Sequence, residues 1–218
     1  MSVSRLVIDT ATEACSVALL ASGGALTANF EILGRGHAER LVPMIRDLPG
    51  NGKAARILVN CGPGSFTGVR VGLAAAKALG FAWSAPVTGY TTHALVAHMA
   101  LRRLDTPQPV DVVMTGGHGE WFVQSFDETG CPAGALQSLS PEQAAAKVSA
   151  DIVAGSQAEA CIALRGHGDA LAILPDAAFA SGLTDDLQNL VPTPIYGRAP
   201  DAKPASRAPQ PLSAKLAV

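Results

Sequence analysis

Residues 56–83 read RILVNCGPGSFTGVRVGLAAAKALGFAW, which combines a short apolar run, a glycine-rich turn and a long apolar segment. The run Ile-Leu-Val at 57–59 is typical of a buried strand. The Gly-Pro-Gly sequence at 62–64 then breaks it, because glycine adopts backbone angles that other residues avoid and proline fixes one dihedral. The stretch therefore predicts a strand, a tight turn and a helix, in that order.

The helix predicted from Val69 to Trp83 carries only two charged residues, Arg70 and Lys77. A helix that is apolar on nearly all sides is normally covered on several of them. One cover can be the protein's own sheet, and the other must be a second helix or a partner chain. Gly72 and Ala76 lie one turn apart, and their small size would let a foreign helix approach closely.

The glycine-rich turn before this helix has two interpretations. Amides at a helix N-terminus can hold a phosphate group, and the same geometry can equally be a tight connection that binds nothing. No P-loop lysine is present, because Val69 and Arg70 follow Gly68, and Ser65 does not lie in a Gly-x-Ser-x-Gly elbow. Thr67 is the predicted N-cap residue of the helix, with Ser65 as the second choice.

Three strands and a helix are predicted before this stretch, at residues 5–9, 15–20, 25–31 and 37–48. The first strand ends at Asp9, which is followed by Thr10. The resulting α/β order, β-β-β-α-β-α with an acidic residue after the first strand, resembles one lobe of the actin, sugar-kinase and Hsp70 superfamily. That resemblance implies that Asp9 and Thr10 face a nucleotide phosphate or its metal. The alternative is that Asp9 caps the hairpin turn.

A shortened second copy of this order is predicted after the proline-rich joint at residues 106–109. Strands are expected at 110–115, 121–127, 135–139 and 152–154, with a helix opening at Ser140. We therefore expect an N-terminal lobe over residues 1–105 and a reduced C-terminal lobe over 106–200. The proline-rich residues 201–218 are predicted to form a flexible, dispensable tail.

Four segments of the chain together resemble one family. The central GPGSFTGVRVGLAAAKALG, the opening VIDTATEACSVAL, the segment GHAERLVPMI and the closing PIYGRAPDA are similar to the TsaB (YeaZ) family. The resemblance implies an actin-like fold and a non-catalytic role in making threonylcarbamoyladenosine in tRNA. The turn at Thr115–Glu120 departs from the pattern of the family, which leaves the role of this part of the second lobe open.

The resemblance and the covering argument together give a set of expected partners. This chain would be a scaffold that pairs with a catalytic homologue, TsaD, and helps the complex engage the ATPase TsaE. The sequence leaves open whether the isolated chain is a monomer or a homodimer, and tRNA would be contacted only through the complex. The partner surface is predicted on the helices at 37–48 and 69–83. Its residues are His37, Leu41, Met44, Ile45, Leu48, Val69, Gly72, Ala76, Leu79 and Trp83.

No catalytic residue and no cofactor of its own is expected, since ATP and metal would belong to the partner subunits. The catalytic paralogue holds its metal with a His-x-x-x-His pair on the helix that matches 37–48. Here His37 is followed one turn later by Leu41, and a lone histidine cannot grip a metal as a pair does. A vestigial phosphate site is predicted at Asp9, Thr10, Gly62, Gly64, Ser65 and Thr67. Because Asp9 would hold no metal, Asp9→Ala is expected to leave folding largely intact.

The composition of the chain agrees with a cytoplasmic location. Its 218 residues carry a formal net charge of −2, which gives no electrostatic footprint for RNA or for an anionic membrane. The four cysteines are scattered without a C-x-x-C pair and are expected to be buried free thiols of a reducing compartment. No signal peptide and no membrane span are predicted.

A second class of function stays open on the residues alone. The chain could be an active small-molecule kinase or ATPase of the actin-like superfamily that uses Asp9 and the turn at 62–68. Binding or hydrolysis of ATP by the purified protein alone would separate this alternative from the scaffold interpretation.

Overall fold

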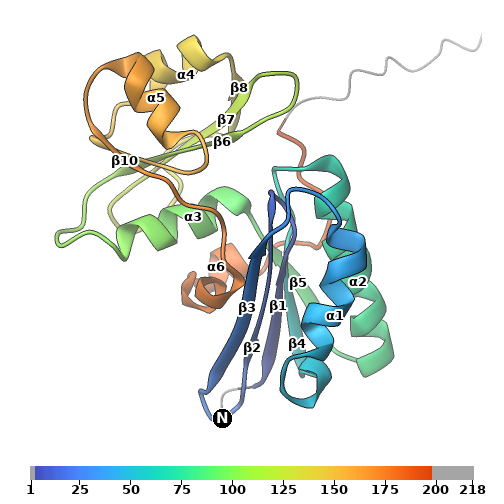
Figure 1. Cartoon of the computed structure of the whole chain (residues 1–218). Helices are drawn as coiled ribbons and strands as arrows, with labels where there is room; N and C mark the ends of the chain where they lie inside the picture. Colours follow the sequence, from blue (N-terminus) through green and yellow to red (C-terminus); the bar gives the residue numbers. More distant parts are fainter. Residues whose placement is uncertain (1–2, 198–218) are drawn as a thin grey trace, which may run out of the picture.

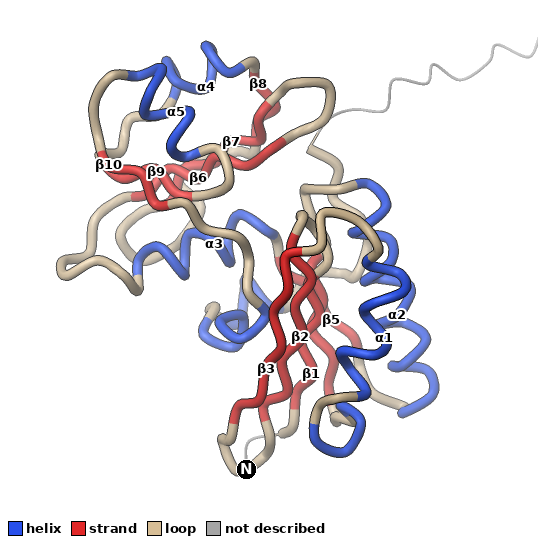
Figure 2. Tube along the Cα trace, in the orientation of Figure 1, coloured by secondary structure: helices blue, strands red, loops and turns tan. Residues whose placement is uncertain are grey.

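The computed structural model describes residues 3–197, which form two five-stranded sheets flanked by helices. Figures 1 and 2 show five layers: two long helices, the first sheet, a central helical layer, the second sheet and two short helices. The predicted tail at 201–218 lies outside the described residues. The fold is α/β with two lobes of like topology, and the predicted actin-like fold class is confirmed.

The first sheet has the strand order β3-β2-β1-β4-β5. β1 pairs antiparallel with β2 and parallel with β4. The elements of this lobe, in chain order, are β1 (Arg5–Asp9), β2 (Ala14–Leu20), β3 (Leu26–Ile32), α1 (His37–Arg46), η1 (Pro49–Gly52), β4 (Arg56–Asn60), α2 (Phe66–Trp83) and β5 (Val87–Tyr90). The predicted strand at 57–59 is the centre of β4, which has neighbours on both edges and is buried on both faces.

The second sheet has the order β10-β9-β6-β7-β8, so its connectivity repeats that of the first sheet. Its elements follow α3 (Thr92–Leu101) and are β6 (Val110–Thr115), β7 (Trp121–Phe126), β8 (Gln137–Leu139), α4 (Pro141–Lys147), β9 (Ile152–Ala154), α5 (Ala158–Arg165) and β10 (Asp169–Leu171). The second copy predicted from the sequence ended with the strand that is β9 here. The structure shows that α5 and β10 also belong to this copy. Both of its outer helices are short, at seven and eight residues.

Alternation along the strands of the first sheet divides its side chains between two cores. Leu6, Ile8 and Val59 face α1 and α2, whereas Val7 and Leu58 face α3. The core around α3 also contains residues of the second sheet, so α3 is the layer that joins the two sheets. β4 therefore reads as a continuous apolar run because each of its faces meets a different helical layer.

The chain returns to the first sheet after β10. η2 (Ala177–Gly182) and α6 (Asp185–Gln188) pack beside α3 against β1, β2 and β5. The Ala177 amide donates to Ser16 Oγ at 3.0 Å, and the Leu190 and Gly89 backbones exchange two hydrogen bonds of 2.8 and 3.1 Å. Residues 176–195, which lie in the predicted 106–200 lobe, thus contact the first sheet. The division into lobes at 105/106 remains a prediction.

Candidate functional site

The glycine-rich turn before α2 closes on the connection between β1 and β2. The Ser65 amide donates to the Ala11 carbonyl at 2.7 Å. A Cβ atom on Gly64 would lie 2.0 Å from the Ala11 oxygen, and one on Gly68 would lie 2.1 Å from the Thr10 oxygen. Real Cβ atoms essentially never come this close to backbone, so these two glycines are needed for the contact between the two turns.

Two amides at the start of α2, those of Ser65 and Gly68, already have partners within the chain. Ser65, the second choice for the cap, is the N-cap residue: its Oγ accepts from the Gly68 amide at 3.2 Å. α2 therefore begins at Phe66, and the prediction of Thr67 as the cap and Val69 as the start was wrong. The Gly62 amide donates to Asn60 Oδ1 at 2.7 Å. With the Ser65 amide also engaged, this geometry favours the structural interpretation of the turn over phosphate binding.

Asp9 lies in a buried polar network where β1, β4 and β5 end. Its Oδ2 accepts from Asn60 Nδ2 and from the Tyr90 hydroxyl, both at 2.7 Å, and its Oδ1 accepts from the Ala11 amide at 3.2 Å. Burial raises the pKa of Asp9 to about 6, against the lowering effect of these hydrogen bonds. Asp9 therefore links the turn after β1 to the ends of β4 and β5 through hydrogen bonds. This agrees with the alternative that Asp9 caps the hairpin turn. Thr10 is equally internal, since its hydroxyl donates to the Gly68 carbonyl at 2.7 Å.

These contacts change one expectation drawn from the sequence. Replacing Asp9 by alanine would leave two buried donors, on Asn60 and Tyr90, without their acceptor. We therefore expect Asp9→Ala to destabilise the fold, whatever its effect on function. The proposed phosphate role of Asp9, Thr10 and the turn remains a prediction, although the residues that would provide it are engaged within the chain.

The residues predicted to form the partner surface mostly lie inside the protein. Eight of the ten are buried: His37, Leu41, Met44, Ile45, Leu48, Val69, Gly72 and Ala76. Leu79 and Trp83 are half-buried against the same core. These side chains therefore pack against the chain's own sheet, and their role as a partner surface remains a prediction.

The small residues of α2 explain this packing. Gly68, Gly72, Ala76 and Gly80 recur every four residues and share one face. A Cβ atom on Gly72 would lie 2.5 Å from Thr10 Oγ1, and one on Gly80 would lie 2.5 Å from Val87 Cγ2. The stripe that seemed suited to a foreign helix thus lets α2 approach the strands of its own sheet.

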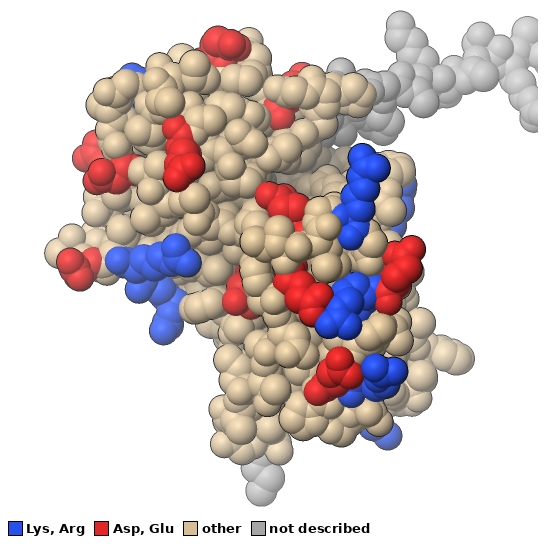
Figure 3. Space-filling view, in the orientation of Figure 1, with Lys and Arg blue, Asp and Glu red and all other residues tan. Residues whose placement is uncertain are grey.

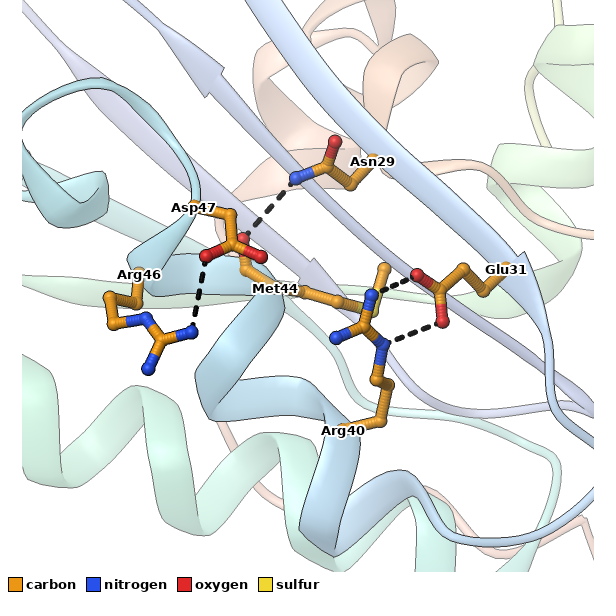
Figure 4. Close-up of polar contacts among 6 residues, drawn as sticks. All are labelled: Asn29, Glu31, Arg40, Met44, Arg46 and Asp47. Atoms are coloured by element: carbon orange, nitrogen blue, oxygen red, sulfur yellow. Dashed lines mark hydrogen bonds and ion pairs between the residues drawn. The ribbon is translucent and has the colours of Figure 1, made fainter.

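Polar contacts fix the orientation of α1 on the same sheet. Figure 4 shows Arg40 reaching from α1 to Glu31 of β3, with Arg40 Nε donating to Glu31 Oε2 at 2.7 Å. One turn further along, the Met44 carbonyl accepts from Asn29 Nδ2 at 3.3 Å. His37, at the first turn, contacts the Ala14 carbonyl through Nε2 at 3.2 Å. The inner side of α1 therefore packs against β2 and β3.

Exposed apolar side chains lie on the opposite side of the two helices, with the exposed Lys77 among those of α2. α1 and α2 lie side by side on the first sheet. Val42 of α1 is 63% exposed and Phe81 of α2 is 91% exposed, and Ala74 and Ala78 are exposed one turn apart on α2. We call these four residues the outer helix face. The sequence did not single them out, because α2 is apolar all round and its pattern cannot tell the inner side from the outer.

Histidines and cysteines form no metal centre in the described part of the chain. Among residues 3–197, no three His, Cys, Asp or Glu side chains lie together as metal ligands would. His93 is buried, with Nε2 3.1 Å from the Phe122 carbonyl, and burial lowers its pKa to about 4. Cys15, Cys61 and Cys161 are buried free thiols, whereas Cys131 is exposed. The lack of a cofactor remains a prediction.

A cleft of about 730 Å³ lies at the glycine-rich turn, between residues of the two sheets. The start of α2 and residues 11–13 line it from the first lobe, and residues 114–118 line it from the second. The divergent turn at Thr115–Glu120 forms part of this second wall. This turn is closed by a hydrogen bond of 2.8 Å that the Gly116 amide donates to the Glu120 carbonyl, and His118 within the turn adopts a positive φ of 57°. Asp9 does not line the cleft.

Charge on the surface agrees with the near-neutral composition. On the face drawn in Figure 3, acidic and basic side chains are interspersed, with broad uncharged areas between them. This face lacks the continuous basic stripe that nucleic-acid-binding proteins use to contact phosphates. Within residues 3–197, no helix combines the length and the apolar character that crossing a bilayer requires.

These features define a two-lobed α/β protein of actin-like topology in which Asp9 and Thr10 make hydrogen bonds within the chain. The family model of TsaD, described as tRNA N6-adenosine threonylcarbamoyltransferase, matches residues 30–158. Two solved structures from Pseudomonas aeruginosa resemble most of the chain. One, YeaZ, has a TM-score of 0.74 at 28% identity and covers 88% of this chain and all of that one. The other, described as similar to peptidase YeaZ, has a TM-score of 0.73 at 32% identity and covers 91% and 100%.

A curated relative gives the same result from sequence. The Escherichia coli tRNA threonylcarbamoyladenosine biosynthesis protein TsaB is 41% identical over 133 residues, which cover 57% of this chain. The match spans 56% of the E. coli protein, so the chain aligns with little more than half the length of that relative. The chain belongs to the TsaB (YeaZ) family, as its sequence motifs predicted.

Proposed function

We propose that this chain acts in tRNA threonylcarbamoyladenosine biosynthesis as a non-catalytic scaffold subunit. Family membership supports the pathway, and the outer helix face carries the proposed role. The catalytic homologue TsaD binds this face, and the ATPase TsaE engages the resulting complex. ATP, metal and most contacts to tRNA belong to those partners. The complex forms in the cytoplasm, and an isolated chain pairs with a second copy through the same face.

The outer helix face has the chemistry of a protein interface. Phe81 is 91% exposed, and burying a phenylalanine against a partner stabilises the complex by roughly 2 kcal/mol. Ala74 and Ala78 are small and exposed, so a helix of the partner can approach α2 closely there. Apolar and aromatic residues are enriched in the centres of interfaces, where charged residues are depleted. The proposal moves the predicted partner surface from the buried side of α1 and α2 to their exposed side.

The alternative function, an active small-molecule kinase or ATPase, has weaker support. Its candidate carboxylate, Asp9, is buried and accepts three hydrogen bonds from within the chain. Its candidate phosphate cradle uses the amides of Gly62, Ser65 and Gly68 for internal bonds. Hydrolysis of ATP by the purified chain alone, lost in Asp9→Asn at unchanged folding, would favour this alternative over the scaffold role.

Pull-down of the catalytic homologue from the same organism tests the scaffold role. Phe81→Glu and Ala78→Trp should each weaken capture about tenfold or more, because a buried charge or an oversized side chain opposes the contact. Phe30→Glu is the matched control. Phe30 is an exposed phenylalanine of β3. The side chains on either side of it, Asn29 and Glu31, contact α1. Because side chains alternate along a strand, the Phe30 ring points away from α1 and α2.

At a protein concentration low enough for the chain to be monomeric, the melting temperatures of all three variants should stay close to that of the wild type, since the three positions are not buried. Unchanged capture by both Phe81→Glu and Ala78→Trp would exclude the outer helix face as the contact. Equal loss of capture in Phe30→Glu would show that the effect is not specific to the helices.

A further inference from the structure

The cleft between the lobes has the size and lining of a small-molecule site. Its volume of about 730 Å³ lies within the range of roughly 300–1,000 Å³ that is typical of ligand pockets. Apolar side chains from both lobes contribute to its wall, including Val69, Met114 and Phe122. The cleft is distinct from the outer helix face, so its ligand does not depend on the proposed scaffold role.

Two aromatic rings and a guanidinium group stand together at this cleft. Arg70 Cζ lies 3.3 Å from the ring centroid of Phe66 and 5.5 Å from that of Tyr196. The two rings are 6.0 Å apart, and Arg70 Nη2 donates to the Tyr196 hydroxyl at 2.6 Å. Phe66 remains 62% exposed and Tyr196 49% exposed. The three side chains thus form a preorganised group that still offers aromatic surface to a ligand.

Tyr196 is held in this position by contacts on either side of it. The Ile195 amide donates to the Cys61 carbonyl at 2.7 Å, which ties the segment to the end of β4. A Cβ atom on Gly197 would lie 2.3 Å from Phe122 Cε1, so the backbone there lies directly against a side chain of β7. The segment therefore touches both lobes, and the tyrosine between these contacts is part of the cleft wall.

The charge of Arg70 is not neutralised within the described chain. Neither of the two ion pairs found in residues 3–197 includes Arg70, and its guanidinium donates to the uncharged Tyr196 hydroxyl. A guanidinium carries five N–H donors in a planar fork that suits a carboxylate or another oxyanion. Glu13 also lines the cleft and disfavours a ligand with several negative charges.

We propose that the cleft binds a small planar aromatic ligand that carries a single anionic group. The aromatic part packs on Phe66 and Tyr196 and fills the apolar wall, while the anionic group pairs with Arg70. A nucleoside triphosphate fits this chemistry poorly, because the amides of Gly62, Ser65 and Gly68 donate within the chain and the Glu13 carboxylate repels a group with several negative charges. The ligand class is therefore an aromatic monoanion.

Fluorescence titration with 8-anilinonaphthalene-1-sulfonate, an aromatic monoanion, tests the proposal on the full chain. Saturable binding of one probe per chain is expected. Phe66→Ala and Arg70→Gln should each raise the dissociation constant about tenfold through lost stacking and lost charge. Binding of the uncharged probe N-phenyl-1-naphthylamine should be weakened by Phe66→Ala. Its affinity for Arg70→Gln should equal its affinity for the wild type.

Two matched variants on the same helix control for non-specific binding to apolar surface. Phe81→Ala removes the most exposed phenylalanine of α2, and Lys77→Gln removes its other cation, neither of which lines the cleft. Both should leave the dissociation constants unchanged. All five proteins should have the same circular dichroism spectrum, since the four substituted side chains are exposed.

Three results would overturn the proposal. The first is wild-type affinity for the sulfonate in both Phe66→Ala and Arg70→Gln. The second is a loss of affinity for the sulfonate in Phe81→Ala or Lys77→Gln that equals the loss in the cleft variants, which would place the probe outside the cleft. The third is displacement of the probe by micromolar Mg-ATP, which would assign the cleft to a nucleotide.

Discussion

The two sides of α2 have nearly the same composition and opposite surroundings. Gly72 and Ala76 on the inner side lie against β1 and β4, whereas Ala74 and Ala78 on the outer side face solvent. On the inner side, small residues allow a helix and a sheet to come into contact. On the outer side, similarly small residues are exposed beside Phe81 and the charged Lys77 in the part of the chain that the structure describes. Small size indicates close approach but not which neighbour approaches.

The same contrast separates the two aromatic residues exposed on α2. Phe66, at the start of the helix, lies beside Arg70 and Tyr196 and lines the cleft. Phe81, near the end of the helix, belongs to the outer helix face and is the more exposed of the two. One helix thus contributes to the core, to a proposed partner surface and to a proposed ligand site. Substitutions along it can separate the three roles.

The largest loss of stability is expected from a substitution on the inner side of α2. Ala76 is fully buried, so Ala76→Trp must displace α2 from the sheet. Overpacking of this kind costs about 3 kcal/mol, which for a chain of this size lowers the melting temperature by roughly 6–12 °C. Thermal unfolding followed by circular dichroism measures the change. A melting temperature equal to that of Ala78→Trp would contradict the assignment of inner and outer sides.

The next effect concerns the network beneath the start of α2. Asp9→Ala leaves the buried donors of Asn60 and Tyr90 unpaired, and we expect a loss of about 2–4 kcal/mol in the free energy of unfolding. Asp105→Ala, at an exposed loop aspartate, should change it by less than about 0.5 kcal/mol. Urea denaturation of both variants provides the comparison. A stable Asp9→Ala protein would restore the expectation that was drawn from the sequence.

The pH dependence of stability should carry the signature of the same carboxyl group. Burial raises the pKa of Asp9 to about 6 from its ordinary value of 3.8, so the folded chain binds this proton more tightly than the unfolded chain. The stabilisation by protonation is fully present below pH 3.8 and is lost as the pH rises through about 6. The free energy of unfolding should therefore fall by up to about 1.4 kcal/mol per pH unit in this window.

Asp9→Asn isolates this contribution, because asparagine does not titrate. The difference in unfolding free energy between the wild type and Asp9→Asn should decline from pH 4 to pH 6 and then level off. A difference that stays constant over this range, measured by urea denaturation at fixed ionic strength, would show that Asp9 does not titrate with a raised pKa.

The smallest effect on stability is expected at the outer helix face. Phe81 and Ala78 are exposed, so Phe81→Glu and Ala78→Trp should each shift the unfolding free energy by less than about 0.5 kcal/mol. Their effect should appear instead in capture of the catalytic homologue. A loss of stability that does not depend on protein concentration would mean that the outer helix face is covered within the chain, whereas a loss seen only at high concentration would agree with the proposed pairing of two copies.

Local patterns predicted much of the first lobe. The strand predicted at 5–9 coincides with β1, and the apolar run at 57–59 lies inside β4. The helix start was misplaced by three residues because both Ser65 and Thr67 can cap a helix, and the choice depends on which hydroxyl reaches the Gly68 amide. The second lobe was followed only to β9. α5 and β10 are short, and neither Ala158–Arg165 nor Asp169–Leu171 has a pattern strong enough to identify it alone.

The candidate sites depended more heavily on tertiary contacts. From the sequence, Asp9 could face a phosphate or cap a turn, and the structure gives it Asn60 and Tyr90 as partners from distant strands. Arg70 was noted only as one of two charges on an apolar helix. Its neighbour Tyr196 is 126 residues away, and no local pattern could have joined the two.

The sequence by itself determined the family, the order of elements from β1 to α2 and the sharp turn between β4 and α2, because each depends on residues that are close together in the chain. Periodicity marks a strand or a helix, and Gly-Pro-Gly marks a turn, wherever they occur. Tertiary structure alone decided which side of α2 is buried and where the cleft lies. A helix that is apolar all round has no preferred side until a sheet covers one, and the cleft exists only where segments from both lobes meet.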